Sequence, residues 1–108
     1  MVTIFKVIFG KKARRDLKDI SDYYQKTASP KVAKKVRKGI VDSAQKLQNF
    51  PHRKPILSGT EGEDSPVRYT KKWSFNILFS IFMDKNEVEV LRIRHDKEPP
   101  EKTIKSVK

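Results

Sequence analysis

The segment from Ser74 to Met83 constrains the fold more than any other part of the chain. Its alternate positions carry large apolar side chains: Phe75, Ile77, Phe79 and Ile81. The residues around them are nearly all apolar as well, which is typical of a strand at the buried centre of a sheet. We therefore predict a central strand here and expect the other elements to be arranged around it.

Two further segments with a two-residue period lie on either side of this strand in the sequence. They run from Val67 to Lys72 and from Glu87 to Arg94, and the turn-forming triplet Asp84-Lys85-Asn86 precedes the last one. All three read as consecutive antiparallel strands. A fourth strand is predicted from Thr3 to Phe9, where β-branched and aromatic residues with one lysine end at a glycine.

In the first half of the chain the apolar period is that of a helix. Apolar side chains recur at helical spacing at Ala13, Leu17, Ile20 and Tyr24, and then at Ala33, Val36, Ile40, Ala44 and Leu47. Ser29-Pro30 is a helix-starting pair, because a serine oxygen accepts a hydrogen bond from an unpaired backbone N–H and proline has no such donor to lose. We predict one helix from Lys11 to about Ala28 and a second to about Asn49, ended by Phe50-Pro51.

The segment from Pro51 to Pro66 contains three prolines, two glycines and three acidic residues, with Ile56-Leu57 as its apolar anchor. It is predicted to be a long exposed loop. The length of 108 residues suits a single domain with one core, with residues from about 96 to 108 as a charged tail. The predicted fold is α+β in the order β-α-α-β-β-β, with a helical hairpin packed on one face of a mainly antiparallel twisted sheet.

The net charge is +12, and it is unevenly distributed. The first 50 residues hold 13 basic and 4 acidic side chains, a net +9, whereas the remainder hold 12 and 9, a net +3. Four lysines fall opposite the apolar face of the second predicted helix and are called the lysine stripe below: Lys31, Lys34, Lys35 and Lys38. Together with Arg53 and Lys54 in the loop, they are predicted to bind nucleic acid or an acidic protein partner. The alternative is a solvated helix face without a specific partner.

Several classes of protein are disfavoured by what the sequence lacks. Without cysteine there are no disulfides, zinc–thiolate sites or thiol nucleophiles. No carboxylate–histidine set has metal-ligand spacing and no glycine-rich phosphate loop occurs, so we expect neither a metal nor another cofactor. No apolar run approaches the ~20 residues needed to cross a bilayer. We expect a cytoplasmic protein without a membrane partner.

The element order and several local patterns resemble the RelE/ParE superfamily of bacterial toxins, the small basic components of type II toxin–antitoxin and plasmid-stabilisation systems. The "A..DL..I..YY" pattern of the first helix stands here at Ala13, Asp16, Leu17, Ile20, Tyr23 and Tyr24. The closing pattern of the second helix stands at Ile40, Leu47, Phe50 and Pro51. In the sheet, the matching positions are Arg68, residues 75–81 and residues 88–95. The resemblance covers nearly the whole chain.

The resemblance implies a growth-inhibiting toxin that a cognate antitoxin neutralises by covering basic and apolar surface. RelE-like members cleave mRNA on the ribosome, whereas ParE-like members inhibit DNA gyrase and are not hydrolases. The arginine expected in the RelE-like pattern "Y-R-I-x-Y" is Asn76 here, and no tyrosine follows Tyr69. A neutral amide does not stabilise a phosphorane as a guanidinium does. The sequence therefore favours the ParE-like branch, with DNA gyrase as the candidate target.

Two alternatives remain open. In a ribosome-dependent mRNA endonuclease, His95 would act as general acid or base while Arg68, Arg92 and Arg94 contact phosphate. In a non-toxic nucleic-acid-binding module, the charge alone would account for function.

Trp73, at the junction of two strands, is predicted to be a structural anchor rather than a platform for stacking bases.

Overall fold

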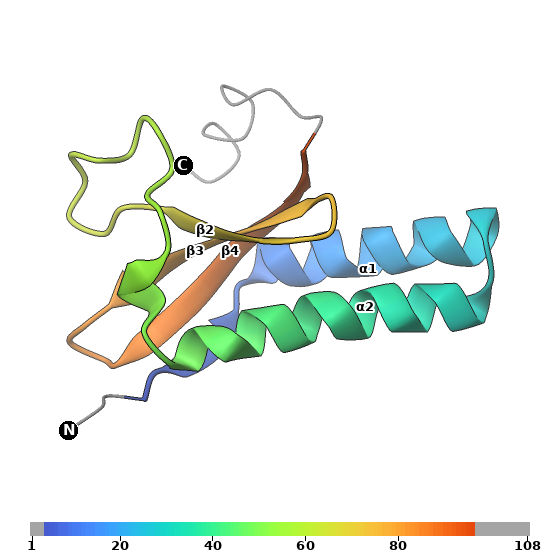
Figure 1. Cartoon of the computed structure of the whole chain (residues 1–108), viewed down its shortest axis with the longest axis horizontal. Helices are drawn as coiled ribbons and strands as arrows, with labels where there is room; N and C mark the ends of the chain where they lie inside the picture. Colours follow the sequence, from blue (N-terminus) through green and yellow to red (C-terminus); the bar gives the residue numbers. More distant parts are fainter. Residues whose placement is uncertain (1–3, 97–108) are drawn as a thin grey trace.

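Four strands and two long helices make up most of residues 4–96, the part of the chain that the computed structural model describes (Figure 1). The elements follow the order β1 (Lys6–Phe9), α1 (Lys11–Thr27), α2 (Pro30–Gln45), β2 (Arg68–Lys72), β3 (Phe75–Phe82) and β4 (Glu87–His95). The predicted element order and α+β class are confirmed. The predicted charged tail, apart from its first residue, lies outside the described residues.

The sheet has the strand order β1-β4-β3-β2. Strands β2, β3 and β4 are antiparallel neighbours, whereas β1 runs parallel to β4, with Lys6 opposite Glu87 and Phe9 opposite Val90. The parallel pairing arises because the helical hairpin returns the chain toward the end where β1 began, and the following meander then places its last strand beside the first. Strand β3 has a neighbouring strand on each side, as its two-sided apolar pattern predicts, and so does β4.

The helical hairpin covers one face of the sheet, and its tip, the turn between α1 and α2, projects beyond the strands (Figure 1). The core between these layers contains Ala13 and Leu17 from α1, Ile40 and Ala44 from α2, and four sheet residues, Phe75, Ile77, Val90 and Ile93. Alanine at the contact positions lets the helices approach the sheet closely. The predicted apolar faces of both helices therefore form the core.

The start of α2 follows the sequence prediction, but its end does not. The Ser29 side-chain oxygen accepts a hydrogen bond from the backbone N–H of Val32 at 3.1 Å, and Pro30 occupies the first turn. The α-helix ends at Gln45 rather than near Asn49, and a short 3₁₀ turn, η1 (Lys46–Gln48), follows it. This turn keeps Leu47 buried, which is why the apolar period continued past the true end of the helix.

The segment predicted as a long exposed loop is partly folded against β2. It begins with a second 3₁₀ turn, η2 (Pro51–Arg53), and Thr60 in its middle is fully buried. The Thr60 hydroxyl donates to the Leu57 carbonyl at 2.8 Å and accepts from the Val67 N–H at 3.2 Å. The strongest anchor of the segment is therefore a hydrogen-bonded threonine, while the predicted anchor, Ile56-Leu57, is half-buried.

A β-bulge in β4 changes which side chains share a face of the sheet. The register shifts by one residue between Leu78 and Phe79, so that Leu78 lies opposite Arg92 but Phe79 lies opposite Val90. The extra residue is Leu91. As a result Ile93 joins Val90 on the face covered by the helices and Arg94 belongs to the other face, whereas the guanidinium of Arg92 reaches Asp16 of α1.

Candidate binding surfaces and predicted site residues

Arg92, a candidate phosphate-binding residue under the nuclease alternative, is held in a largely buried ion pair between the sheet and α1. Its Nε lies 2.7 Å from Oδ2 of Asp16, and its Nη2 lies 3.0 Å from Oδ1. The same carboxylate accepts the backbone N–H of Ile93 at 3.0 Å. Because β1 pairs with β4 only as far as Val90, Asp16 supplies an acceptor where β1 has ended. The Asp16 carboxylate thus provides the hydrogen-bond acceptor at the edge of β4 that a longer β1 would otherwise supply.

Arg68 also has a structural role. Its Nη1 donates to the backbone carbonyls of His52 and Lys54, at 3.1 and 2.8 Å. These two carbonyls belong to the η2 turn and the residue that follows it, so the guanidinium ties the start of the long segment to the edge strand. Arg68 is not among the residues that line the groove containing Arg94 and His95.

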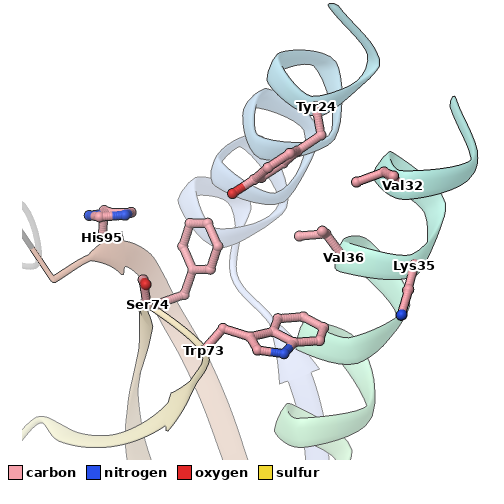
Figure 2. Close-up of a pocket in the computed structure, with 8 residues that line it drawn as sticks. Tyr24, Val32, Lys35, Val36, Trp73, Ser74 and His95 are labelled. Carbon is pink, nitrogen blue, oxygen red and sulfur yellow. The ribbon is translucent and has the colours of Figure 1, made fainter. Parts of the chain in front are cut away.

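Arg94 lines a groove on the face of the sheet away from the helices, which we call the open-face groove. His95 lines it too, but its ring packs on Phe75 and it also lines the groove on the helix side described below (Figure 2). The open-face groove has a volume of about 420 Å³ and is also lined by Tyr69, Lys71 and Asn76. Burial, reinforced by the nearby positive charge of Arg92, lowers the pKa of Arg94. A guanidinium nevertheless stays protonated near neutral pH.

A carboxylate occupies one side of the open-face groove. Asp96 accepts a hydrogen bond from the side-chain amide of Asn76 at 2.8 Å and forms an ion pair with Lys71 at 3.0 Å. The hydrogen bond from Lys71 is the main reason that the pKa of Asp96 is lowered, with smaller contributions from Asn76 and from positive charge nearby. One of the cations in the groove is therefore already neutralised.

Tyr69, Lys71, Asn76 and Asp96 were not among the predicted site residues. Tyr69 and Lys71 alternate along β2, and Lys71 is opposite Asn76, which is opposite Arg94. The alternation could be found in the sequence, but the pairing across three strands requires the register, including the bulge. His95 packs edge-to-face against Phe75 with ring centroids 5.5 Å apart.

A second groove lies on the helix side, between the projecting hairpin and the end of the sheet. We call it the apolar groove; its volume is about 380 Å³. Figure 2 shows Tyr24 from α1, Val32 and Val36 from α2 and Trp73 from the β2–β3 turn around it. Lys35 of the lysine stripe stands at its rim, so a positive charge borders the apolar surface (Figure 2).

Trp73 closes one end of the apolar groove by packing on α2. A Cβ atom built on Gly39 would overlap the tip of the Trp73 indole, so only glycine leaves room for this contact. Trp73 has a φ of 53° and is 52% exposed. The indole is thus an anchor at the edge of the sheet, as its position in the sequence predicted.

Beyond Trp73 the space between α2 and β2 becomes strongly positive. This basic groove, of about 460 Å³, is lined by five cations: Lys46, Arg53, Lys54, Lys71 and Lys72. Arg53 and Lys54 were predicted to bind a negative partner. The lysine stripe lies elsewhere, on the exposed face of α2, where Lys38 pairs with Asp42 at 3.5 Å. The predicted cations thus fall into two separate surfaces.

Residues 4–96 contain no group of three or more His, Asp or Glu side chains placed to hold a metal ion. Within the same part of the chain, neither helix has the length and hydropathy that crossing a membrane requires.

Comparisons with known proteins agree with the architecture. A family model described as "ParE toxin of type II toxin-antitoxin system, parDE" matches residues 7–100. A solved chain of the chromosomal ParDE TA system from P. aeruginosa is 26% identical with a TM-score of 0.71, and the alignment covers 86% of this chain and 97% of that chain. A chain of the toxin–antitoxin complex RelBE2 from Mycobacterium tuberculosis, 20% identical with a TM-score of 0.57, shares the fold over 89% of this chain and 95% of that chain. Comparison with curated protein sequences gave no match.

Proposed function

The chain belongs to the ParE toxin family of type II toxin–antitoxin systems, and from that premise we propose that it stops growth by binding a cytoplasmic target, with DNA gyrase as the first candidate, and that it is not a hydrolase. A cognate antitoxin holds it inactive. The observation that supports binding over hydrolysis is that two of the candidate arginines, Arg68 and Arg92, are bonded to other parts of the fold. Arg92 is bonded to a buried carboxylate through Nε and Nη2, and Nη1 of Arg68 is bonded to two backbone carbonyls, so both guanidinium groups already have a structural role.

The apolar groove is the surface that suits the antitoxin best. It offers apolar side chains from both helices and from the β2–β3 turn, with Lys35 at the rim. Val32, Tyr23 and Trp73 on or near it are exposed in the isolated chain, at 38%, 60% and 52%. Large apolar side chains exposed next to one another mark an interaction surface. An antitoxin segment with apolar residues followed by acidic ones would match both the groove and its rim.

Induction of the chain in bacteria tests the toxin proposal. Growth should stop, and co-expression of a cognate antitoxin should restore it. Purified protein should inhibit supercoiling by DNA gyrase, with denatured protein as the control. Growth arrest without any effect on gyrase would contradict gyrase as the target, and normal growth in a susceptible host would contradict toxicity itself.

A second candidate function, ribosome-dependent mRNA cleavage, is favoured by one observation. The open-face groove contains a tyrosine, a lysine, an arginine and a histidine, Tyr69, Lys71, Arg94 and His95. These residue types can supply an acid, a base and positive charge for metal-independent RNA cleavage. Primer extension on translated mRNA would reveal cuts at defined codon positions, and His95→Ala should abolish them. Absence of cuts during growth arrest would exclude this mechanism.

A further inference from the structure

The basic groove contains more positive charge than its place in the fold requires. Its five cations come from three separate segments, the end of α2, the η2 turn with the residue after it, and β2. None of the described residues lining the groove is acidic. A concave surface lined by charge of one sign concentrates the electrostatic field and draws in ions of the opposite sign.

Four of the five cations have no acidic partner among residues 4–96. Lys71 is paired with Asp96 at the other side of β2. Arg53 lies over the ring of Phe50 at 4.2 Å, and Lys72 lies over the ring of Trp73 at 4.5 Å. These contacts position the two side chains without cancelling their charge, because an aromatic ring is neutral. Within the described part of the chain, the groove therefore carries close to four uncompensated positive charges.

Stabilisation of the helix end accounts for only part of this charge. The C-terminus of a helix carries roughly half a negative charge, which a single nearby lysine balances. Lys46 is placed at the end of α2 and can do so. The remaining cations, on η2 and β2, are not needed for that purpose, and repulsion between them makes their proximity unfavourable in the absence of an anion.

An exposed aromatic ring lies beside these cations. Phe50 is 47% exposed, has a φ of 52° and lines the groove. Stacking of bases on aromatic rings, together with cations that follow the backbone, is how proteins bind single-stranded nucleic acids. An acidic peptide would satisfy the cations but would gain little from a flat aromatic ring among them.

We propose that the basic groove binds single-stranded nucleic acid, with backbone phosphates on Lys46, Arg53 and Lys54 and a base against Phe50. The lysine stripe takes no specific part, because its four exposed side chains lie on α2 and none of them lines the basic groove. This site is separate from the surface proposed for the antitoxin, since it shares no lining residue with the apolar groove.

Two triple variants of the full chain with equal loss of charge test the proposal. The groove variant is Lys46→Ala, Arg53→Ala and Lys54→Ala, and the control variant is Lys31→Ala, Lys34→Ala and Lys38→Ala; all six side chains are exposed. Binding of a fluorescently labelled oligothymidylate and of an oligouridylate is followed by anisotropy at several salt concentrations. Far-UV circular dichroism verifies that each variant is folded.

The groove variant should bind at least about 10-fold more weakly, and its plot of log affinity against log salt should be shallower by about 2, since each phosphate contact on a single strand contributes about 0.7 to the slope. The control variant should stay within about twofold of the parent chain. Phe50→Ala should weaken binding about fivefold or more without changing the slope, because stacking releases no counterions.

Equal weakening by the two triple variants would overturn the proposal in favour of diffuse charge attraction. Absence of oligonucleotide binding by the parent chain would overturn it as well. Binding of polyglutamate with the same dependence on the groove, together with an unaffected Phe50→Ala variant, would assign the groove to an acidic protein instead.

Discussion

Removal of the Asp16 carboxylate is expected to destabilise the protein more than any other single loss of an acidic side chain among residues 4–96. In the Asp16→Ala variant the guanidinium of Arg92 and the backbone N–H of Ile93 both lose their acceptor. The two paired side chains are only 12% and 15% exposed, so water can replace the carboxylate only in part. Leaving one partner of a buried pair uncompensated costs about 3–5 kcal/mol. We expect about 3 kcal/mol here because of the residual exposure.

Urea unfolding followed by tryptophan fluorescence measures this loss, since the chain has a single tryptophan. For a domain of this size, 3 kcal/mol corresponds to a fall in melting temperature of about 10–20 °C. The slope of the unfolding free energy against urea should remain constant, because the surface exposed on unfolding does not change.

The exposed pair of Lys38 and Asp42 provides a matched control. Its atoms are 3.5 Å apart and its side chains are 76% and 58% exposed. Asp42→Ala removes the same charge as Asp16→Ala but should cost less than about 0.5 kcal/mol. Asp16→Asn retains one acceptor oxygen, so its loss of stability should lie between those of Asp16→Ala and Asp42→Ala. If Asp16→Ala proves no more destabilising than Asp42→Ala, the reasoning about burial is refuted.

Three smaller perturbations test other parts of the structure. Gly39→Ala should displace the indole of Trp73 and shift its fluorescence emission to longer wavelength. The net change in stability should be small, because alanine gains about 1 kcal/mol in helix propensity over glycine. An unchanged emission spectrum would contradict the packing of Trp73 on α2. Ser29→Ala should cost about 1 kcal/mol in urea unfolding, because Ala has no oxygen to accept the Val32 N–H, and Ser29→Gly, which suits an N-cap position, only a few tenths; no loss in Ser29→Ala would argue against capping. Asp96 has a lowered pKa in the folded state, so its contribution to stability is present above the ordinary aspartate pKa of about 3.9 and is lost as the pH falls through the folded-state value. Carboxyl titration by NMR should show a higher midpoint for Asp96 in Lys71→Ala than in the parent chain, and an identical midpoint would exclude Lys71 as the main cause.

The elements of the fold were predictable because each follows from a local pattern. The alternation in β3 and the helical spacing of Leu17 and Ile40 require no knowledge of distant residues. The end of α2 was placed too late because a 3₁₀ turn carries Leu47 into the core much as another helical turn would. The burial of Thr60 was missed because a polar side chain gives no apolar signal.

The surfaces were less predictable, because they depend on register and on contacts between distant segments. Strict alternation along β4 places Ile93 on the face opposite to Val90, and only the bulge brings the two together. The ion pair of Arg92 with Asp16 joins residues on different elements, and no spacing rule indicates it. The basic groove likewise gathers cations from helix, turn and strand, so the sequence showed their charge but not their convergence.

The pairing of β1 with β4 has a consequence for the time at which a newly made chain acquires its structure. Synthesis delivers β1 and both helices first, but their apolar faces pack against β3 and β4, which are made last. Contacts between the ends of a chain form slowly, and an incomplete chain has no sheet on which to close. An interrupted translation product that lacks β4 would leave β1 without its neighbouring strand and the helices without Val90 and Ile93. The complete fold therefore forms only after translation has passed the last strand, which separates the start of synthesis from the appearance of the folded protein.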